Sequence, residues 1–116
     1  MFRFEELEIW KLSIIYARGM YLVANGFPRI EQFALADQLR RASVSISNNI
    51  AEGSGGTPKD FSNFINIAIK STLETVNILY IARMQDYITD DKRKNYYSEA
   101  EKLIKMMRAF RKTLDQ

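Results

Sequence analysis

Apolar residues recur at alternating steps of three and four along most of the chain, a spacing that puts one side of a helix against a core. The pattern falls into four segments, at about 5–25, 35–53, 58–88 and 90–114, joined by glycine, proline or helix-capping residues. The strand-like alternation around 42–47 is too short to outweigh the longer helical spacing on both sides of it. The sequence therefore predicts an all-α protein.

The first helix is expected to end at Asn25-Gly26, because the residue before Pro28 avoids the helical region. The second is expected to stop at Gly53. The third has a strong start signal, with Thr57 as the cap and Pro58 in the first helical position. Short links between four helices predict one domain over residues 1–116, an up-down-up-down four-helix bundle.

The spacing also predicts which residues face the core. The inward faces of the four segments are, in chain order, Leu7, Trp10, Ile14, Ala17, Tyr21 and Ala24; Leu35, Leu39, Ala42, Ile46 and Ile50; Phe61, Ile65, Ala68, Thr72, Val76, Leu79 and Arg83; and Tyr97, Ala100, Ile104, Met107, Phe110 and Leu114.

The second segment is unusually small and polar for a core helix. Ala36, Ser43 and Ser47 would let a neighbouring backbone approach closely. Arg41, Asn49 and Glu52 need partners if they turn inward, since a buried unpaired amide costs about 1–3 kcal/mol. Glu74 in the third segment is a plausible partner for an arginine, so a buried or half-buried polar network is one expectation. A solvated helix face is the alternative.

The chain contains neither cysteine nor histidine. This composition excludes a disulfide framework, a thiol nucleophile, Ser-His and Cys-His pairs, and the usual zinc sites. We therefore expect no enzyme, no metal site and no cofactor. Acids near the N-terminus do not suit a signal peptide, and no run approaches the roughly 18 apolar residues of a membrane span, so a cytoplasmic protein is expected.

The net charge of +3 comes entirely from the last segment. Residues 89–116 hold eight basic and five acidic residues, whereas the basic and acidic residues before them balance. The excess recurs at helical spacing, which predicts one basic stripe formed by Lys102, Lys105, Arg108, Arg111 and Lys112. Such a stripe suits nucleic acid, although in a single copy a solvated face is the favoured interpretation.

Two other features were weighed as nucleic-acid contacts. Tyr96 and Tyr97 follow three cations and are candidates for base stacking, with core packing expected for at least one of them. The loop GSGGT at 53–57 lacks the spacing of a phosphate-binding loop, and Pro58 removes an amide that would face an anion. A simple turn is therefore expected there.

Several motifs together resemble one known family. FEELEIW at 4–10, QLRRASVSI at 38–46, NIAEG at 49–53 and DFSNF at 60–64, with Glu74, are similar to the four-helix-bundle family of 23S ribosomal-RNA intervening-sequence proteins. The same fold family includes the accessory variability proteins of diversity-generating retroelements. The resemblance implies a homopentameric barrel and association with nucleic acid. For the accessory branch it also implies a reverse-transcriptase partner.

By position, Arg41, Asn49, Glu52 and Glu74 match recurrent polar residues of that family, and we interpret them as structural or interfacial. The leading hypothesis is a non-enzymatic, oligomeric protein that binds RNA or DNA through a basic surface repeated by symmetry. The alternative is an adaptor that docks a reverse transcriptase or another enzyme.

Overall fold

The computed structural model describes residues 1–115, and over that range it contains four α-helices, two short 3-10 turns and no strand. This architecture confirms the all-α, four-helix prediction. The bundle measures 45 × 23 × 21 Å along its principal axes. The elements are η1 (Arg3–Glu6), α1 (Glu8–Asn25), η2 (Arg29–Glu31), α2 (Leu35–Gly53), α3 (Pro58–Met84) and α4 (Asp90–Leu114).

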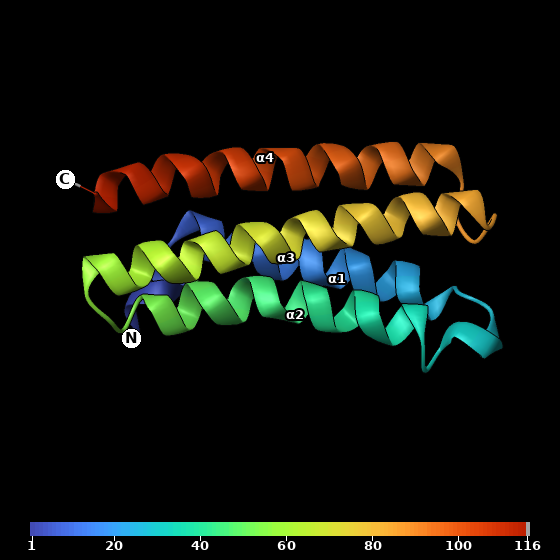
Figure 1. Cartoon of the computed structure of the whole chain (residues 1–116), viewed down its shortest axis with the longest axis horizontal. Coiled ribbons are helices and arrows are strands. Elements are labelled where there is room, and N and C mark those ends of the chain that lie inside the picture. The colour runs from blue at the N-terminus through green and yellow to red at the C-terminus, as the bar shows by residue number, and fades with distance from the viewer. Residues whose placement is uncertain (116) are drawn as a thin grey trace.

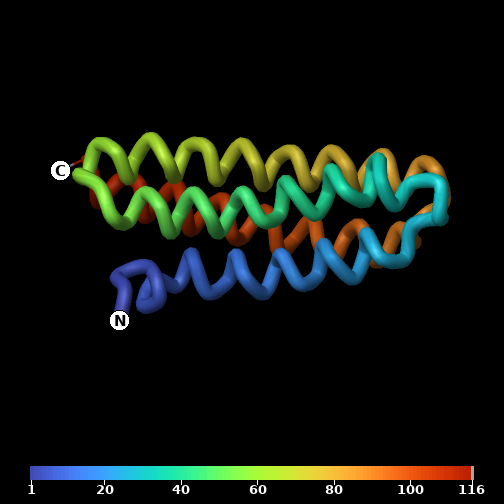
Figure 2. The backbone as a smooth tube through the Cα atoms, turned by 90° about the horizontal axis from the view of Figure 1, so that it is seen from below, coloured from blue at the N-terminus to red at the C-terminus, as the bar shows by residue number. Residues whose placement is uncertain are grey.

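The four helices run up and down in chain order. Figure 1 shows α4, α3 and α2 side by side, with α1 behind them, and both chain ends lie at the same end of the bundle. Figure 2, from below, shows α1 set apart from the other helices. Among the neighbouring helices of the bundle, α2 and α3 have the most extensive contact and α1 and α4 the least. The bundle is therefore most open along the α1–α4 seam.

The inward face of α2 is the one that the spacing predicts. Leu39, Ala42, Ile46 and Ile50 are all buried. Two serines that face the core satisfy their hydroxyls within the helix, Ser43 by donating to the Arg40 carbonyl (2.8 Å) and Ser47 to the Val44 carbonyl (3.3 Å). A third, Ser45, shares a 2.9 Å hydrogen bond with Ser71 of α3. The hydroxyls on and beside the buried face of α2 are thus all hydrogen-bonded, and Ser45 makes its bond across the contact with α3.

The inward face predicted for α1 is partly wrong. Ile14 and Tyr21 are exposed, and the side that meets the core carries Ile9, Ser13, Tyr16, Gly19, Met20, Val23 and Ala24. Apolar residues surround much of this helix, so the sequence alone does not show which side of it is buried. At Gly19 a Cβ atom would lie 2.5 Å from the Tyr96 ring, so the glycine admits that ring from α4.

Helix α3 ends at Met84, four residues before the predicted end near Ile88. The Tyr87 amide donates to the Ala82 carbonyl (2.8 Å), and the Asp86 amide donates to the Arg83 carbonyl (3.1 Å). Asp86 has φ of 60°, the only positive value for a residue other than glycine between residues 1 and 115. The helix is thus followed by a residue in the left-handed conformation. Glycine is usual at this position, but here the residue is Asp86.

One hydrogen bond crosses the core between α1 and α3. The Tyr16 hydroxyl lies 2.8 Å from Thr75 Oγ1, and that threonine donates to the Thr72 carbonyl at 2.6 Å, so Tyr16 is the donor in the pair. Burial is the main reason that the pKa of Tyr16 is raised to about 12. The neutral phenol is therefore strongly favoured in the folded protein.

We expect Tyr16→Phe to lower the free energy of unfolding by about 1 kcal/mol at pH 8, because a buried hydrogen bond is lost. As pH rises from 10 toward 12, unfolded Tyr16 ionises before folded Tyr16, so the wild type loses stability. By pH 11 this loss is about 1.4 kcal/mol, and Tyr16→Phe escapes it. The two stabilities should therefore converge or cross between these pH values in urea unfolding followed by circular dichroism.

Tyr97→Phe, at a solvent-exposed ring, controls for the removal of a tyrosine. A constant difference between wild type and Tyr16→Phe from pH 8 to pH 11 would contradict the role given to the buried phenol.

We expect Asp86→Gly to raise the free energy of unfolding by about 0.5–1 kcal/mol, since glycine adopts φ of 60° without a Cβ clash. Asp86→Asn is the matched control, because it removes the charge and the exposed pair with Arg83 but keeps the side chain. Thermal unfolding should place the Gly variant above the wild type and the Asn variant close to it. A less stable Gly variant would show that the ion pair outweighs the backbone cost.

Candidate nucleic-acid interface

The C-terminal half of α4 carries five cations, Lys102, Lys105, Arg108, Arg111 and Lys112, and no carboxylate lies between them in sequence. All are exposed except Arg111, which is half-buried and donates to Asn66 Oδ1 of α3. Within residues 1–115, none of the five takes part in an ion pair. Their charge is therefore not compensated by side chains of the same chain.

Cations of the predicted stripe border two different recesses of the bundle, and the single stripe stays a prediction. Lys102 lines a small recess between α1 and α4, whereas Lys105 and Arg108 line a separate recess between α3 and α4. Arg111 also reaches α3, and Lys112 follows Arg108 by four residues, which places the two on one face. We call Lys105, Arg108, Arg111 and Lys112 the basic flank.

The α3–α4 recess has a volume of about 260 Å³ and mixes apolar and charged walls. Leu73 and Val76 of α3 and Tyr97 and Ile104 of α4 form its apolar part, and Lys105, Arg108 and Glu101 complete it. On the opposite side of α4, Glu6 and Glu8 line a groove with Phe110, and Glu99 lines the recess that holds Lys102. The basic flank thus has fewer acidic neighbours than the α1 side, which strengthens its positive field.

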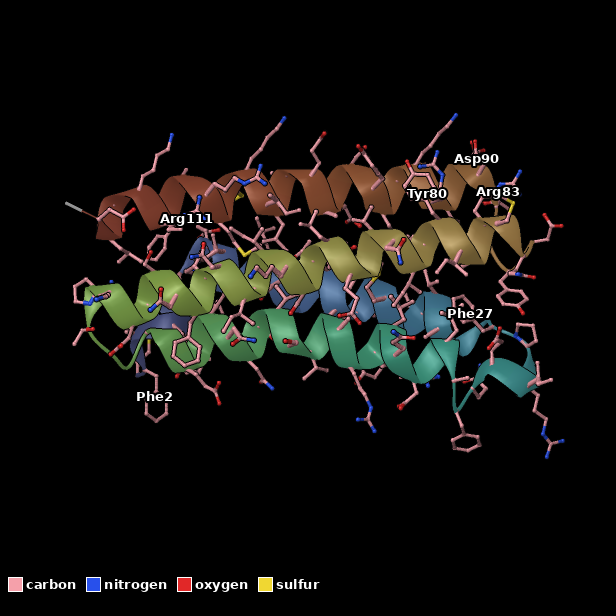
Figure 3. The ribbon with its side chains drawn as sticks, in the orientation of Figure 1. Phe2, Phe27, Tyr80, Arg83, Asp90 and Arg111 are labelled. Carbon is pink, nitrogen blue, oxygen red and sulfur yellow. The ribbon has the colours of Figure 1, made fainter. Side chains whose placement is uncertain are left out.

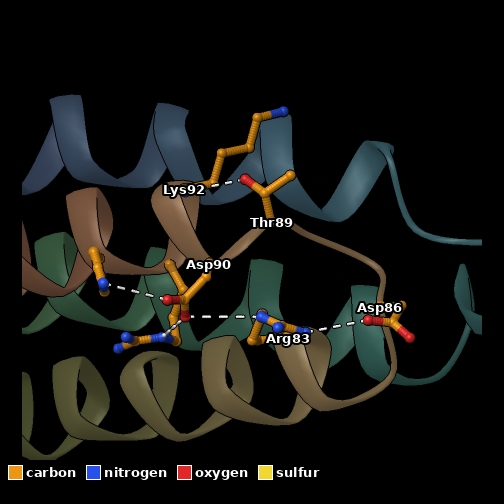
Figure 4. Close-up of polar contacts among 7 residues, drawn as sticks. Arg83, Asp86, Thr89, Asp90 and Lys92 are labelled. Atoms are coloured by element: carbon orange, nitrogen blue, oxygen red, sulfur yellow. Dashed lines mark hydrogen bonds and ion pairs between the residues drawn. The ribbon is translucent and has the colours of Figure 1, made fainter.

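The N-terminal part of α4 is different, because two of its three cations, Arg93 and Lys94, pair with Asp90 (Figure 4). Asp90 lies 3.1 Å from Arg93 Nε, 3.4 Å from Lys94 Nζ and 3.7 Å from Arg83 Nε. The hydrogen bond from Arg93 is the main reason that the pKa of Asp90 lies below its ordinary value. Figure 3 shows Tyr80, Arg83 and Asp90 together at this end, with Arg111 toward the other end. Within residues 1–115, the cations of α4 that make no ion pair are Lys92 in its first turn and the five of its C-terminal half.

The two neighbouring tyrosines of α4 have different surroundings. Tyr96 is half-buried against Gly19 of α1, and burial raises its pKa above the ordinary value. Tyr97 is 38% exposed, lines the α3–α4 recess and meets the Tyr80 ring edge-on, with 6.4 Å between centroids. Core packing of one tyrosine is confirmed, and Tyr97 is the ring left open to solvent.

Sequence reasoning missed Tyr80 and Arg93 as a pair. The guanidinium carbon of Arg93 lies 4.6 Å from the centre of the Tyr80 ring, in a cation–π contact between α4 and α3. Only the turn between the helices sets which residues meet there, so no spacing within one segment identifies the pair.

The polar network expected inside the chain is absent for three of its four members. Arg41 has a side chain that is 81% exposed and donates to Asp37 one turn earlier on α2 (2.9 Å), and Glu52 and Glu74 are exposed. Asn49 is half-buried and donates to the Ser45 carbonyl (2.7 Å). Burial of these charges within the chain is thus wrong, because the helix surface and water satisfy them. A role between subunits stays a prediction.

Three of these residues nevertheless share a surface. Arg41, Asn49 and Glu52 line a shallow polar groove along α2, together with Tyr21, Asp37, Arg40, Val44, Ser45 and Asn48. Glu74, on α3, is not among the residues that line it.

The glycine-rich loop before α3 is a turn, as expected. Thr57 Oγ1 accepts a hydrogen bond from the Asp60 amide, and Asp60 Oδ2 accepts one from the Thr57 amide, both at 3.1 Å. The Asp60 carboxylate also lies against Gly56, where a Cβ atom would be 3.0 Å from its oxygen. A carboxylate thus occupies the helix N-terminus and leaves no place for a phosphate.

Other kinds of site find no support in residues 1–115. No group of three or more carboxylates in this range is arranged to hold a metal ion. None of the helices described is both long enough and apolar enough to cross a membrane.

The fold and this surface define a small four-helix-bundle protein with an uncompensated basic flank on its last helix. A sequence model of the family described as 23S rRNA-intervening sequence protein matches residues 5–109. The chain belongs to this family. Among curated proteins, no relative matches it.

A solved structure supports the same fold. The chain is similar to a protein of unknown function from the S23 ribosomal protein family of Bacteroides thetaiotaomicron, whose crystal structure was determined at 1.70 Å resolution. The two chains are 24% identical, with a TM-score of 0.82. The match covers 90% of this chain and 98% of the other. At this identity the likeness establishes the four-helix architecture alone.

Proposed function

We propose that the protein is a non-enzymatic nucleic-acid-binding protein that contacts the phosphate backbone through its basic flank. The observation that carries this proposal is the set of cations on α4 that have no carboxylate partner within residues 1–115. Unpaired lysine and arginine side chains gain most from phosphates, because binding releases the counterions condensed on the nucleic acid. Binding of this kind is salt-sensitive and weakly selective for sequence.

RNA is the first nucleic acid to test. The family to which the chain belongs is named after intervening sequences of 23S rRNA. A DNA of the same length serves as the comparison, because a contact with phosphates alone does not distinguish the two.

In an oligomer the basic flank would be present several times, which would strengthen the binding of nucleic acid. Ile15 and Leu22 of α1 are each 61% exposed and lie two helical turns apart on one face. Exposed apolar side chains of this kind favour contact with another protein surface. We propose that they contribute to a homo-oligomer, for which the family resemblance suggests a pentamer. Symmetry would then repeat the basic flank around the particle.

A second candidate function is an adaptor that docks a reverse transcriptase or another enzyme. Phe33 and Ile30, in the link between α1 and α2, are almost fully exposed, and such side chains favour a protein partner. Charge reversal on the basic flank discriminates between the candidates, because an adaptor that uses the apolar link would keep its partner while a nucleic-acid-binding protein would lose its ligand.

We expect the double variant Lys105→Glu, Arg108→Glu to weaken RNA binding at least tenfold at about 50 mM salt. The slope of log affinity against log salt concentration should become shallower by about two for each basic flank that contacts the nucleic acid, because two phosphate contacts are lost. Fluorescence anisotropy with a labelled 23S rRNA fragment measures both values. The variant should keep the native mass in light scattering.

Lys59→Glu with Lys70→Glu is the matched control, because both lysines are exposed on α3 and the change in net charge is the same. Equal weakening in the control would mean that net charge, and not the basic flank, governs binding. Unchanged binding in the flank variant at low salt would refute the proposed surface.

We expect light scattering of the wild type to give a mass of several chains, and Ile15→Lys with Leu22→Lys to reduce it, because two charges would then enter the proposed contact. Ile30→Lys is the control, since this side chain is more exposed and lies outside α1. A wild type that is monomeric at working concentration would contradict the oligomer.

A further inference from the structure

The α3–α4 recess holds three features that charge alone does not explain. Its floor is apolar, its one aromatic wall is the exposed Tyr97, and two cations of the basic flank stand at the same opening. Leu73, on the facing wall, is also about half exposed. A surface that contacted only phosphates would gain nothing from an apolar recess between its cations.

The available ring in this recess is Tyr97. The neighbouring Tyr80 carries the Arg93 guanidinium 4.6 Å from its centre, so one face of that ring is already covered. The Tyr97 and Tyr80 rings are nearly perpendicular, with an interplanar angle of 85°, and Tyr97 is 38% exposed and lines the recess. An exposed aromatic face beside cations is the arrangement on which single-stranded nucleic acids stack their bases.

The size and charge of the recess fit one base and its flanking phosphates. About 260 Å³ is below the usual range for a pocket that holds a drug-sized ligand, but it accommodates a flat ring between Leu73 and Tyr97. Lys105 and Arg108 line the same recess and offer positive charge to the phosphates on either side of that base. In a duplex the bases are stacked and paired inside the helix, so they cannot enter it.

On the basis of the nucleic-acid binding proposed above, we infer that the α3–α4 recess is a subsite for an unpaired base of single-stranded nucleic acid. Tyr97 supplies the stacking surface, Leu73 the opposite apolar wall, and Lys105 and Arg108 the phosphate contacts. The basic flank then binds any nucleic acid, and the recess adds a preference for single strands.

The test compares a labelled oligouridylate with an oligo(A)·oligo(U) duplex of the same length, by fluorescence anisotropy on the full chain at low salt. Tyr97→Leu keeps the wall apolar and removes the ring. We expect it to weaken single-strand binding about tenfold and duplex binding less than about twofold. Leu73→Asn makes the other apolar wall of the recess polar. We expect it, too, to weaken single-strand binding more than duplex binding.

Two tyrosine variants are matched controls. Tyr97→Phe keeps the ring and should bind like the wild type. Tyr21→Leu makes the same substitution as Tyr97→Leu at a ring of equal exposure, 40% against 38%, but on α1 and outside the recess. It should leave the single-strand preference unchanged.

The outcomes separate this inference from the proposed function. If the wild type binds both nucleic acids but Tyr97→Leu weakens both equally, or neither, the recess is not a base subsite although nucleic-acid binding stands. If Tyr97→Leu changes the native mass in light scattering, the recess is a contact between copies and the inference is overturned. If the wild type binds neither probe, both proposals fail.

Discussion

The contact between α2 and α3 is the constraint on which the rest of the bundle depends. The two helices share the most extensive contact between elements of residues 1–115, and the Ser45–Ser71 hydrogen bond crosses it. The core can therefore be closed by Ile46, Ile50 and Ile65 without unpaired polar groups. With α2 and α3 fixed, α1 and α4 each dock on one flank, and their own contact stays small.

The turn between α3 and α4 determines which residues of α4 lie opposite α3. The left-handed residue Asp86 ends α3, and the link to Thr89 fixes where α4 begins along its neighbour. This register brings Tyr97 opposite Tyr80, and Lys105 and Arg108 into the recess that Leu73 lines. Asp90 pairs with Arg93 and Lys94 near the start of α4, whereas the five cations of its second half have no such partner within residues 1–115.

Much of the fold could be predicted from the sequence, because helical spacing and caps are local. The four helices, the inward face of α2 and the capping Thr57 are all confirmed. The predicted buried side of α1 was partly wrong, as at Ile14, because apolar residues surround this helix. The end of α3 was missed because neither glycine nor proline marks it.

By itself the sequence determined the helical class, the family, the lack of histidine and cysteine chemistry, and the excess of positive charge near the C-terminus. Tertiary structure alone decided which cations share a surface. It placed Lys105 and Arg108 in a recess that Tyr97 and Leu73 also line, placed Lys102 in another recess, and left Arg41 in solvent. The physical reason is that charge and periodicity are properties of one segment, whereas a recess needs two helices whose register is fixed by packing and by the turn between them.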